Sequence, residues 1–286
     1  LIELGLAARS RYKHPVIAIT GTVGKSSTLH MLEEMLREHG RALTTIDNYN
    51  SRVGVPAMLA SLAADDHAAL LEIAQSALWM RRGPITRLVR PWVSIITEIA
   101  LSQTNAMVRS IDDVVRWKSR IFEGLSGPAI AVIGDHLHGF QRIADSALTH
   151  AKRIVVYGES TTAEVRLLES RPDVLSQSAT LSVGGRIVEL ELPVAGKGMM
   201  RNALAALAAL YALGYDVEQC ARRLSRYRSP EGRLVHGKVR INDALVTLID
   251  DSYNAEVASM IHAFEVLALH QVPSEARRIA VLGRIV

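Results

Sequence analysis

The sequence contains a single cysteine, only 5% aromatic residues and no long uninterrupted apolar run. Because Cys220 stands alone, no intrachain disulfide can form, which excludes a small disulfide-stapled protein and fits a reducing cytoplasm. No stretch reaches the roughly 18–20 uncharged apolar residues of a membrane-spanning helix, and the N-terminus lacks the pattern of a signal peptide. We therefore expect a cytoplasmic protein without a membrane span.

The composition that remains is that of an ordinary globular α/β protein, with 49% hydrophobic and 22% charged residues among 286. At about 100–200 residues per domain, this length favours two domains, each able to bury its own core. The net charge of +4 could favour nucleic acid, but the arginines are scattered rather than clustered with aromatic residues. We expect no nucleic-acid partner, and a phosphate-bearing substrate would account equally well for the charge.

The first apolar run, Val16–Thr20, is short and rich in β-branched residues, and a glycine-rich turn and a helical pattern follow it directly. Such runs alternate with helical patterns further along the chain, which is typical of a mostly parallel sheet flanked by helices. The later runs are Ala69–Ile73, Val93–Thr97, Ala129–Ile133 and Ile154–Tyr157. The fold class is therefore α/β, a doubly wound sheet of the phosphate-loop type.

Two further regions follow this sheet. Between Ala163 and Val194, short alternating pieces around Gly184-Gly185 predict a small antiparallel region, and an apolar helix follows from Asn202 to Leu210. A new αβ pattern then begins, with a strand, a helix and a strand at Ala244–Ile249, Ala255–Leu269 and Arg278–Leu282. We expect a central domain at residues 1–232 and the beginning of a Rossmann-like domain at 233–286, which we expect to continue beyond this chain.

The turn after the first strand, Gly21–Ser26, lies where backbone N–H groups and a helix dipole converge on an anion. Lys25 can bridge the β and γ phosphates of ATP, and the Ser26 hydroxyl can ligate Mg²⁺. Ile19 stands where the generic spacing requires another glycine, so a glycine-rich turn with a surface lysine is the alternative. The flanking strand and helix favour the ATP site, whose predicted contacts are Gly21, Thr22, Gly24, Lys25, Ser26 and Ser27.

The shortened form G-T-x-G-K-S/T resembles the ATP-binding loop of the Mur ligases, which build the peptide stem of the bacterial cell wall. Three segments extend the resemblance over almost the whole chain, and each is similar to the family branch that adds D-alanyl-D-alanine. They read RSRYKHPVIAITGTVGKS from Arg9, DNYNSRVGVPAMLASL from Asp47 and LIDDSYNAEVASM from Leu248. The resemblance implies an ADP-forming ligase that uses ATP and Mg²⁺ to join a small carboxylate to an amine through an acyl phosphate.

The same resemblance assigns catalytic roles to Lys25, Glu72 and Lys118. Glu72 matches a glutamate that holds the metal together with Ser26, although a carboxylate at a strand end is often only a solvated cap. Lys118 matches a lysine that is carbamylated in many members and then supports a second Mg²⁺. Its local pattern alone would place it on the solvent-facing side of an amphipathic helix.

Three more residues match nucleotide contacts of the family. Asn202 matches an asparagine that contacts adenine, and a helix N-cap is its alternative role. Arg233 matches an arginine that approaches the phosphates, or it is simply an exposed residue after a turn. Asp251 matches an aspartate that binds the ribose of ATP, with local turn capping as the alternative.

Two departures from the family pattern leave details open. Gln103 stands where the family has a histidine near the second metal, and an amide oxygen ligates Mg²⁺ more weakly than a carboxylate. Met199 lies in a segment, Gly196–Met200, that lacks the histidine and the first asparagine usual before Asn202. His136 and His138 are separated by one residue and lack a third ligand nearby, so we expect them to be surface or core residues.

Two other functions remain compatible with these residues. The departures at Gln103 and Met199 are compatible with a related ligase that makes a poly-amino-acid or a specialised metabolite. A nucleotide-binding regulator or scaffold without turnover would carry the same phosphate loop. The sequence alone does not identify the acid, the amine or the oligomeric state.

Overall fold

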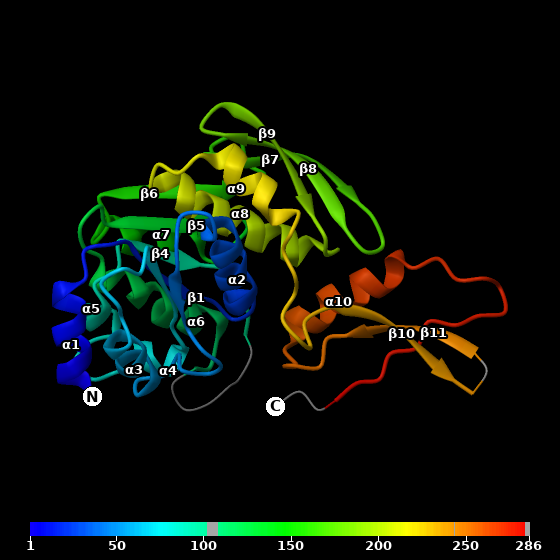
Figure 1. The fold of residues 1–286 in the computed structure, drawn as a ribbon, viewed down its shortest axis with the longest axis horizontal. Coiled ribbons are helices and arrows are strands. Elements are labelled where there is room, and N and C mark those ends of the chain that lie inside the picture. Colours follow the sequence, from blue (N-terminus) through cyan, green and yellow to red (C-terminus); the bar gives the residue numbers. More distant parts are fainter. Residues whose placement is uncertain (102–107, 243, 284–286) are drawn as a thin grey trace.

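A computed structural model describes residues 1–101, 108–242 and 244–283 of the chain. Within these residues the main feature is a nine-stranded sheet in the order β2-β3-β1-β4-β5-β6-β7-β8-β9 (Figure 1). Its strands are β1 (Val16–Thr20), β2 (Ala42–Thr44), β3 (Ala68–Glu72), β4 (Val93–Ile96), β5 (Ile130–Gly134), β6 (Arg153–Gly158), β7 (Val165–Pro172), β8 (Gln177–Val183) and β9 (Arg186–Leu192). Strands β2 to β7 pair in parallel, which confirms the predicted α/β class.

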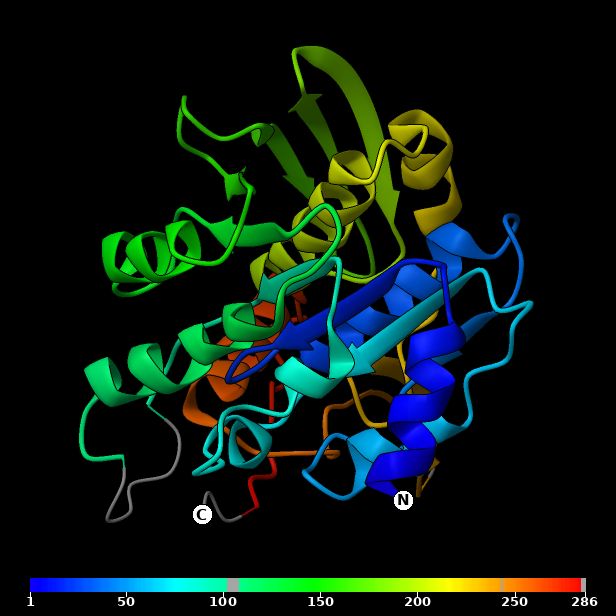
Figure 2. The ribbon, with the colours of Figure 1, turned by 90° about the vertical axis from the view of Figure 1, so that its left-hand side faces the viewer.

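Helices cover both faces of this sheet (Figure 2). One face carries α2 (Lys25–Leu36), α8 (Lys197–Ala212) and α9 (Val217–Leu224). The other carries α1 (Ile2–Arg11), α3 (Gly54–Ala60), α4 (Gln75–Leu78), α5 (Thr86–Val89), α6 (Ile111–Ser119), the 3₁₀ helix η1 (Arg120–Gly124) and α7 (Phe140–Leu148). No helix in the described part of the chain is both long enough and apolar enough to cross a membrane.

The central strand β1 is buried on both faces, as its uninterrupted apolar sequence predicts. Ile17 and Ile19 pack under α2 and α8, whereas Val16 and Ala18 pack in the core on the opposite face. This alternation follows from the two-residue period of a strand and gives two separate apolar cores. The strand therefore holds the loop that follows it in a fixed position.

Beyond β7 the sheet continues with the antiparallel strands β8 and β9, joined by the turn Gly184-Gly185. Both glycines have positive φ, as a two-residue hairpin turn requires. The predicted antiparallel region is thus confirmed. The apolar helix predicted at Asn202–Leu210 is confirmed as well, but it begins five residues earlier, at Lys197.

The C-terminal part differs from its prediction. It contains a separate antiparallel pair, β10 (Val235–Ile241) and β11 (Ala244–Asp250), followed by α10 (Val257–Leu269). The strand predicted at Ala244–Ile249 and the helix predicted at Ala255–Leu269 are present, whereas the strand predicted at Arg278–Leu282 is wrong. That apolar segment lies beside no other described strand, and a strand forms only where a neighbour accepts its hydrogen bonds.

Candidate active site

The loop Gly21–Ser26 lies at the carboxyl end of β1, between β3 and β4. The chain passes from β3 on one side of β1 to β4 on the other, and open parallel sheets bind ligands at such a switch point. Helix α2 begins at Lys25, and its N-cap is Gly24, which has no side chain to occupy the first amide groups. These amides and the helix dipole therefore form an anion site.

The loop is fixed by the residues that follow β4. The Thr97 hydroxyl donates to the carbonyl of Val23 at 2.6 Å, and the Thr22 amide donates to the carbonyl of Glu98 at 2.8 Å. Gly21 has no room for a side chain, because a β-carbon there would collide with the Thr97 hydroxyl. Backbone geometry at this turn is thus set by the neighbouring strand.

Lys25 and Ser27 occupy the start of α2. The Lys25 ammonium donates to the carbonyls of Gly21 at 3.1 Å and Thr22 at 3.2 Å, which keeps the positive charge on the loop. Ser27 is buried and lines a pocket beside the phosphate loop. Eight predicted nucleotide contacts line this pocket together, namely Thr22, Gly24, Lys25, Ser26, Ser27, Asn202, Arg233 and Asp251.

Ser26 and Glu72 provide oxygen atoms suited to a hard cation. The Ser26 hydroxyl donates to Glu72 Oε2 at 2.8 Å, and the amide of Asn50 donates to Glu72 Oε1 at 2.8 Å. Glu72 is buried, so it is not the solvated cap considered as its alternative. Across the described ranges no cluster of three metal-ligating side chains occurs, so Mg²⁺ here would complete its shell with phosphate oxygens and water.

Lys118 is buried on α6, and its predicted alternative as a solvent-facing residue is wrong. Burial and the nearby charge of Lys25 hold the pKa of Lys118 well below its usual value. The carboxylates of Glu256 and Glu72 act in the opposite direction. The three predicted catalytic residues, Lys25, Glu72 and Lys118, therefore lie close enough for their charges to interact. The lowered pKa gives Lys118 a larger neutral fraction than a surface lysine has.

Asn202 lies in the interior of α8, so its alternative as an N-cap is wrong. Its side chain packs against Gly24, where the φ of +88° and the contact with the Asn202 amide both require glycine. The amide nitrogen of Asn202 lies 3.8 Å from the sulfur of Met199. Asn202 thus connects helix α8 to the phosphate loop.

Arg233 and Asp251 reach the pocket from the C-terminal part. Arg233 donates to the Ser26 hydroxyl at 3.2 Å and is half-buried, so it is not merely an exposed arginine. Asp251 accepts from the amide of Leu234 at 3.2 Å, a residue far away in sequence. The local turn cap is its neighbour Asp250, which accepts from the amide of Ser252.

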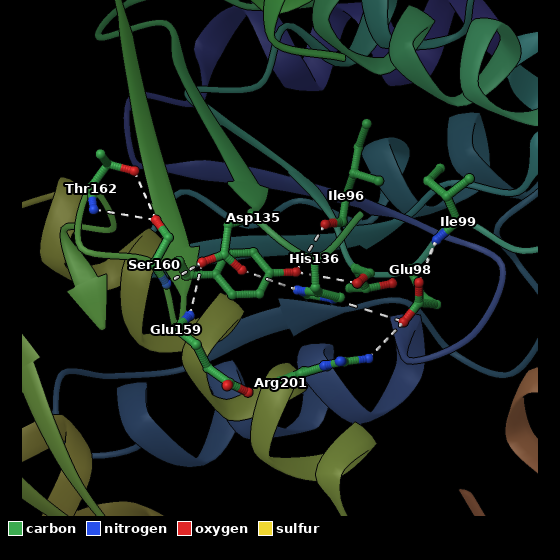
Figure 3. Close-up of polar contacts among 11 residues, drawn as sticks. Ile96, Glu98, Ile99, Asp135, His136, Glu159, Ser160, Thr162 and Arg201 are labelled. Atoms are coloured by element: carbon green, nitrogen blue, oxygen red, sulfur yellow. Dashed lines mark hydrogen bonds and ion pairs between the residues drawn. The ribbon is translucent and has the colours of Figure 1, made fainter. Parts of the chain in front are cut away.

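Four residues of this site escaped the sequence analysis: Asn50, Thr97, Glu98 and Arg201. Thr97 and Glu98 directly follow a strand beside β1, and this position at a switch point was a usable signal. Glu98 Oε2 lies 3.6 Å from Arg201 and 3.8 Å from the Nε2 of His136 (Figure 3). No local pattern indicates this cluster, because its members come from the segments after β4 and β5 and from α8.

The remaining residues singled out in the sequence are His136, His138, Cys220 and Gln103. His136 belongs to the Glu98 cluster, whereas the half-exposed His138 pairs with Asp112 on α6. Cys220 is a residue of α9 and is buried in the core that this helix covers. Gln103 lies outside the described residues.

Comparisons with known proteins agree with this geometry. A family profile described as "Mur ligase middle domain" matches residues 19–210. The chain is 28% identical over 273 residues to the UDP-N-acetylmuramoyl-tripeptide--D-alanyl-D-alanine ligase of Escherichia coli, covering 93% of this chain and 58% of that protein. The Bacillus subtilis protein of the same name is 26% identical over 272 residues, covering 94% and 55%. The chain thus spans a little over half the length of these relatives.

Solved structures give the same picture. MurF from Acinetobacter baumannii superposes with a TM-score of 0.84 at 27% identity, over 94% of this chain and 58% of that one. A folylpolyglutamate synthase from Mycobacterium tuberculosis, complexed with ADP, has a TM-score of 0.71 at 20% identity, over 94% and 70%. The second likeness concerns the fold alone.

Proposed function

Because this chain belongs to the Mur ligase family, we propose that it binds ATP and Mg²⁺ and uses ATP to join a carboxylate to an amine. The observation that carries this proposal is the convergence of Lys25, the Ser26–Glu72 pair and the buried Lys118 around one phosphate loop. Relatives named as ligases and ADP-bound proteins of the same fold support it. A site for phosphates alone would not require the buried lysine.

In the proposed reaction the substrate carboxylate attacks the γ-phosphorus of ATP, which forms an acyl phosphate and releases ADP. The amine then attacks the acyl carbon, the C–O bond to phosphate breaks, and an amide and inorganic phosphate leave. Ser26 and Glu72 would hold Mg²⁺, which would supply charge neutralisation on the phosphates. Lys25 and the loop amides orient the γ-phosphate, so the protein contributes positioning and electrostatics rather than covalent catalysis.

We assign Lys118 a carbamylated state. A neutral amine attacks CO₂, and burial beside Lys25 enlarges the neutral fraction of Lys118. The resulting carbamate is a carboxylate-like group that can support a second Mg²⁺. Carbon-13 NMR of protein incubated with labelled bicarbonate should give a carbamate signal that Lys118→Arg removes and that the exposed control Lys197→Arg retains. A signal unchanged in Lys118→Arg would contradict the assignment.

For the substrates we propose a nucleotide-linked wall precursor as the acid and D-alanyl-D-alanine as the amine, as the names of the relatives indicate. This reaction belongs in the cytoplasm, where ATP and such precursors are available. The alternative within the family is a ligase for a poly-amino-acid or a specialised metabolite. The departure at Met199 favours keeping this alternative in the substrate screen.

The decisive experiment incubates the full-length protein with ATP, Mg²⁺ and candidate acid and amine pairs. We expect ADP release to require the acid, and phosphate and amide to appear together only when the amine is added. ADP release indifferent to both substrates would count against ligation. ATP binding without acid-dependent turnover would identify a scaffold; Lys25→Ala does not separate these functions, because it weakens nucleotide binding under both.

We also propose that residues 1–232 form the ATP-binding domain and that 233–286 form part of a second αβ domain. The hairpin and α10 expose several large apolar side chains, namely Val239, Leu245, Leu248, Ile261 and Phe264. So many exposed apolar side chains on so small a unit indicate a further layer that covers them. Limited proteolysis of the full-length protein should leave a stable fragment ending near residue 232, whereas early cleavage within the nine-stranded sheet would contradict this division.

A further inference from the structure

The pocket beside the phosphate loop combines two chemically different groups of side chains. One group comprises Lys25, Ser26 and Arg233, whose positive charges and hydroxyl suit phosphate oxygens. The other comprises Glu98 and Arg201, a carboxylate and a guanidinium that line the same pocket side by side. A carboxylate repels phosphates, so the second group suits a different part of the nucleotide.

Glu98 and Arg201 are held loosely enough to bind a third group. Their closest atoms, Glu98 Oε2 and Arg201 Nη1, are 3.6 Å apart, which is too long for a hydrogen bond. Glu98 Oε1 accepts from the amide of Ile99 at 3.0 Å, and this bond orients the carboxylate. Within the described ranges the Arg201 guanidinium has no hydrogen-bond acceptor, so its N–H groups remain available.

The surroundings of Glu98 and Arg201 leave both side chains able to bind a nucleobase. Both Arg201 and His136 point towards Glu98 (Figure 3). Burial lowers the pKa of His136 to about 4, so the ring is neutral at pH 7 and does not neutralise Glu98. The Glu98 side chain is 17% exposed, on a pocket that the phosphate loop also lines.

The first turn of α8 contributes few polar side chains that could bind the nucleobase. Gly198 and Met199 offer no polar side chain, and a β-carbon at Gly198 would collide with the ring of His262 from α10. The Asn202 amide is packed between Gly24 and Met199. Arg201 and Glu98, which line the same pocket, offer a donor and an acceptor for a base edge beside this apolar start of α8.

An acceptor beside a donor matches one purine and opposes the other. The exposed edge of adenine presents N7 as an acceptor and the N6 amino group as a donor, whereas guanine presents two acceptors, N7 and O6. Arg201 can donate to N7 while the Glu98 carboxylate accepts from N6. With guanine, Arg201 could still donate to N7, but O6 would face the Glu98 carboxylate as one acceptor against another, so the discrimination rests on Glu98.

We propose that Glu98 and Arg201 form an adenine-reading pair that selects ATP over GTP in this chain. The inference rests on the proposed function only in that the pocket binds a nucleotide. It assigns N6 of the base to Glu98 and N7 to Arg201. Each assignment can be tested separately with a modified nucleotide that lacks one of these groups.

The test measures dissociation constants by calorimetry for the full-length protein with ATP, GTP, 7-deaza-ATP and N6,N6-dimethyl-ATP. We expect the wild type to prefer ATP over GTP by about 10- to 100-fold, the discrimination of one good bidentate contact. The loss with 7-deaza-ATP should disappear in Arg201→Met, and the loss with the dimethyl analogue should disappear in Glu98→Leu. Glu98→Gln should lower the ATP preference at least several-fold, because an amide can donate to O6.

Glu159→Gln serves as the matched control, since Glu159 is an exposed acid in the same region. It should leave every ratio unchanged, and circular dichroism checks that each variant folds. Equal wild-type affinities for ATP and GTP would overturn the inference. An unaltered preference for ATP over GTP in Glu98→Gln would overturn it as well. Absence of binding for all four nucleotides would instead overturn the proposed function together with it.

Discussion

Gly24 and Asn202 are in such close contact that a β-carbon on Gly24 would collide with the amide oxygen of Asn202. The contact joins the N-terminus of α2 to the second turn of α8, two helices on the same face of the sheet. Gly24 also has a φ of +88°, which other residues rarely adopt. The loop shape therefore depends on glycine for two independent reasons.

Gly24→Ala should consequently destabilise the protein more than an alanine at another glycine with similar backbone geometry. Gly185, in the hairpin turn, has a φ of +86° and no neighbour within 4 Å of a built β-carbon. We expect about 1–2 kcal/mol of lost stability in Gly185→Ala from the left-handed backbone alone. Gly24→Ala should add about 1–3 kcal/mol from overpacking. Urea unfolding measures both, and equal losses would contradict the role of Asn202.

A second prediction concerns the buried ion pair between α2 and α9. Arg223 donates to Glu34 at 2.6 Å, and both side chains are about nine-tenths buried. Arg223→Ala would leave the Glu34 carboxylate without its buried partner, at a cost near the lower end of about 3–5 kcal/mol, because Arg37 also pairs with Glu34. Thermal or denaturant unfolding of the purified variant measures the loss.

The control for that variant lies one residue earlier. Arg222 is exposed, and among the described residues its ion-pair contact is with Glu218 on the same helix, at 3.7 Å. Arg222→Ala should therefore change stability by less than about 0.5 kcal/mol. Similar losses in the two variants would mean that Arg223 acts through helix propensity rather than through Glu34.

These pairs mark the limit of what the sequence could predict. The strand Val16–Thr20, the phosphate loop and the hairpin around Gly184-Gly185 follow from local patterns, because apolar periodicity and glycine placement determine them. The burial of Lys118 does not follow, since its own helix is amphipathic and the charged groups that act on it, Lys25, Glu72 and Glu256, come from distant parts of the chain. Tertiary packing overrides the local pattern there.

The C-terminal part shows the opposite error. Arg278–Leu282 has the apolar composition of a strand, yet the described chain gives it no neighbouring strand. Val235–Ile241 contains a glycine and two basic residues and still forms β10, because β11 accepts and donates its hydrogen bonds. Glu98 and Arg201 are more than one hundred residues apart in the sequence and are likewise brought together by the fold. No local pattern could therefore pair them.

The neighbouring aspartates Asp250 and Asp251 should give stability opposite dependences on pH. Burial raises the pKa of Asp251 to about 6, so the folded state keeps a proton that the unfolded state has already released above its ordinary value of 3.8. Folding then takes up a proton, and the contribution of Asp251 to stability falls as pH rises from about 4 to about 6. Asp251→Asn should remove this decline.

Asp250 provides the contrast. Hydrogen bonds from Ser252 hold its pKa below the ordinary value of 3.8, so its contribution is present above that value and is lost as pH falls. Urea unfolding at a series of pH values should show that the difference between wild type and Asp250→Asn changes only in acid. If Asp251→Asn followed that same acid-only profile, burial would not be the force acting on Asp251.

The last prediction concerns the metal dependence of nucleotide binding. Glu72 accepts from Ser26 on one oxygen and from Asn50 on the other, so Asn50 orients the carboxylate that faces the proposed cation. Asn50→Ala should raise the Mg²⁺ concentration needed for half-maximal ATP affinity by about 10-fold, the lower end of outer-shell effects, and Glu72→Gln should raise it further. Both variants should bind ATP in EDTA as the wild type does.

Glu33→Gln is the matched control, because Glu33 lies on the same helix as Ser26 and, within the part of the chain that the structure describes, pairs with His30 near the surface. Its Mg²⁺ requirement should equal that of the wild type, and titration of ATP binding with Mg²⁺ compares the three variants directly. If Glu72→Gln weakened ATP binding equally with and without Mg²⁺, Glu72 would act by supporting the loop through Ser26. In that case the cation would have to be held by other oxygen atoms, and the role of Glu72 as a ligand would be abandoned.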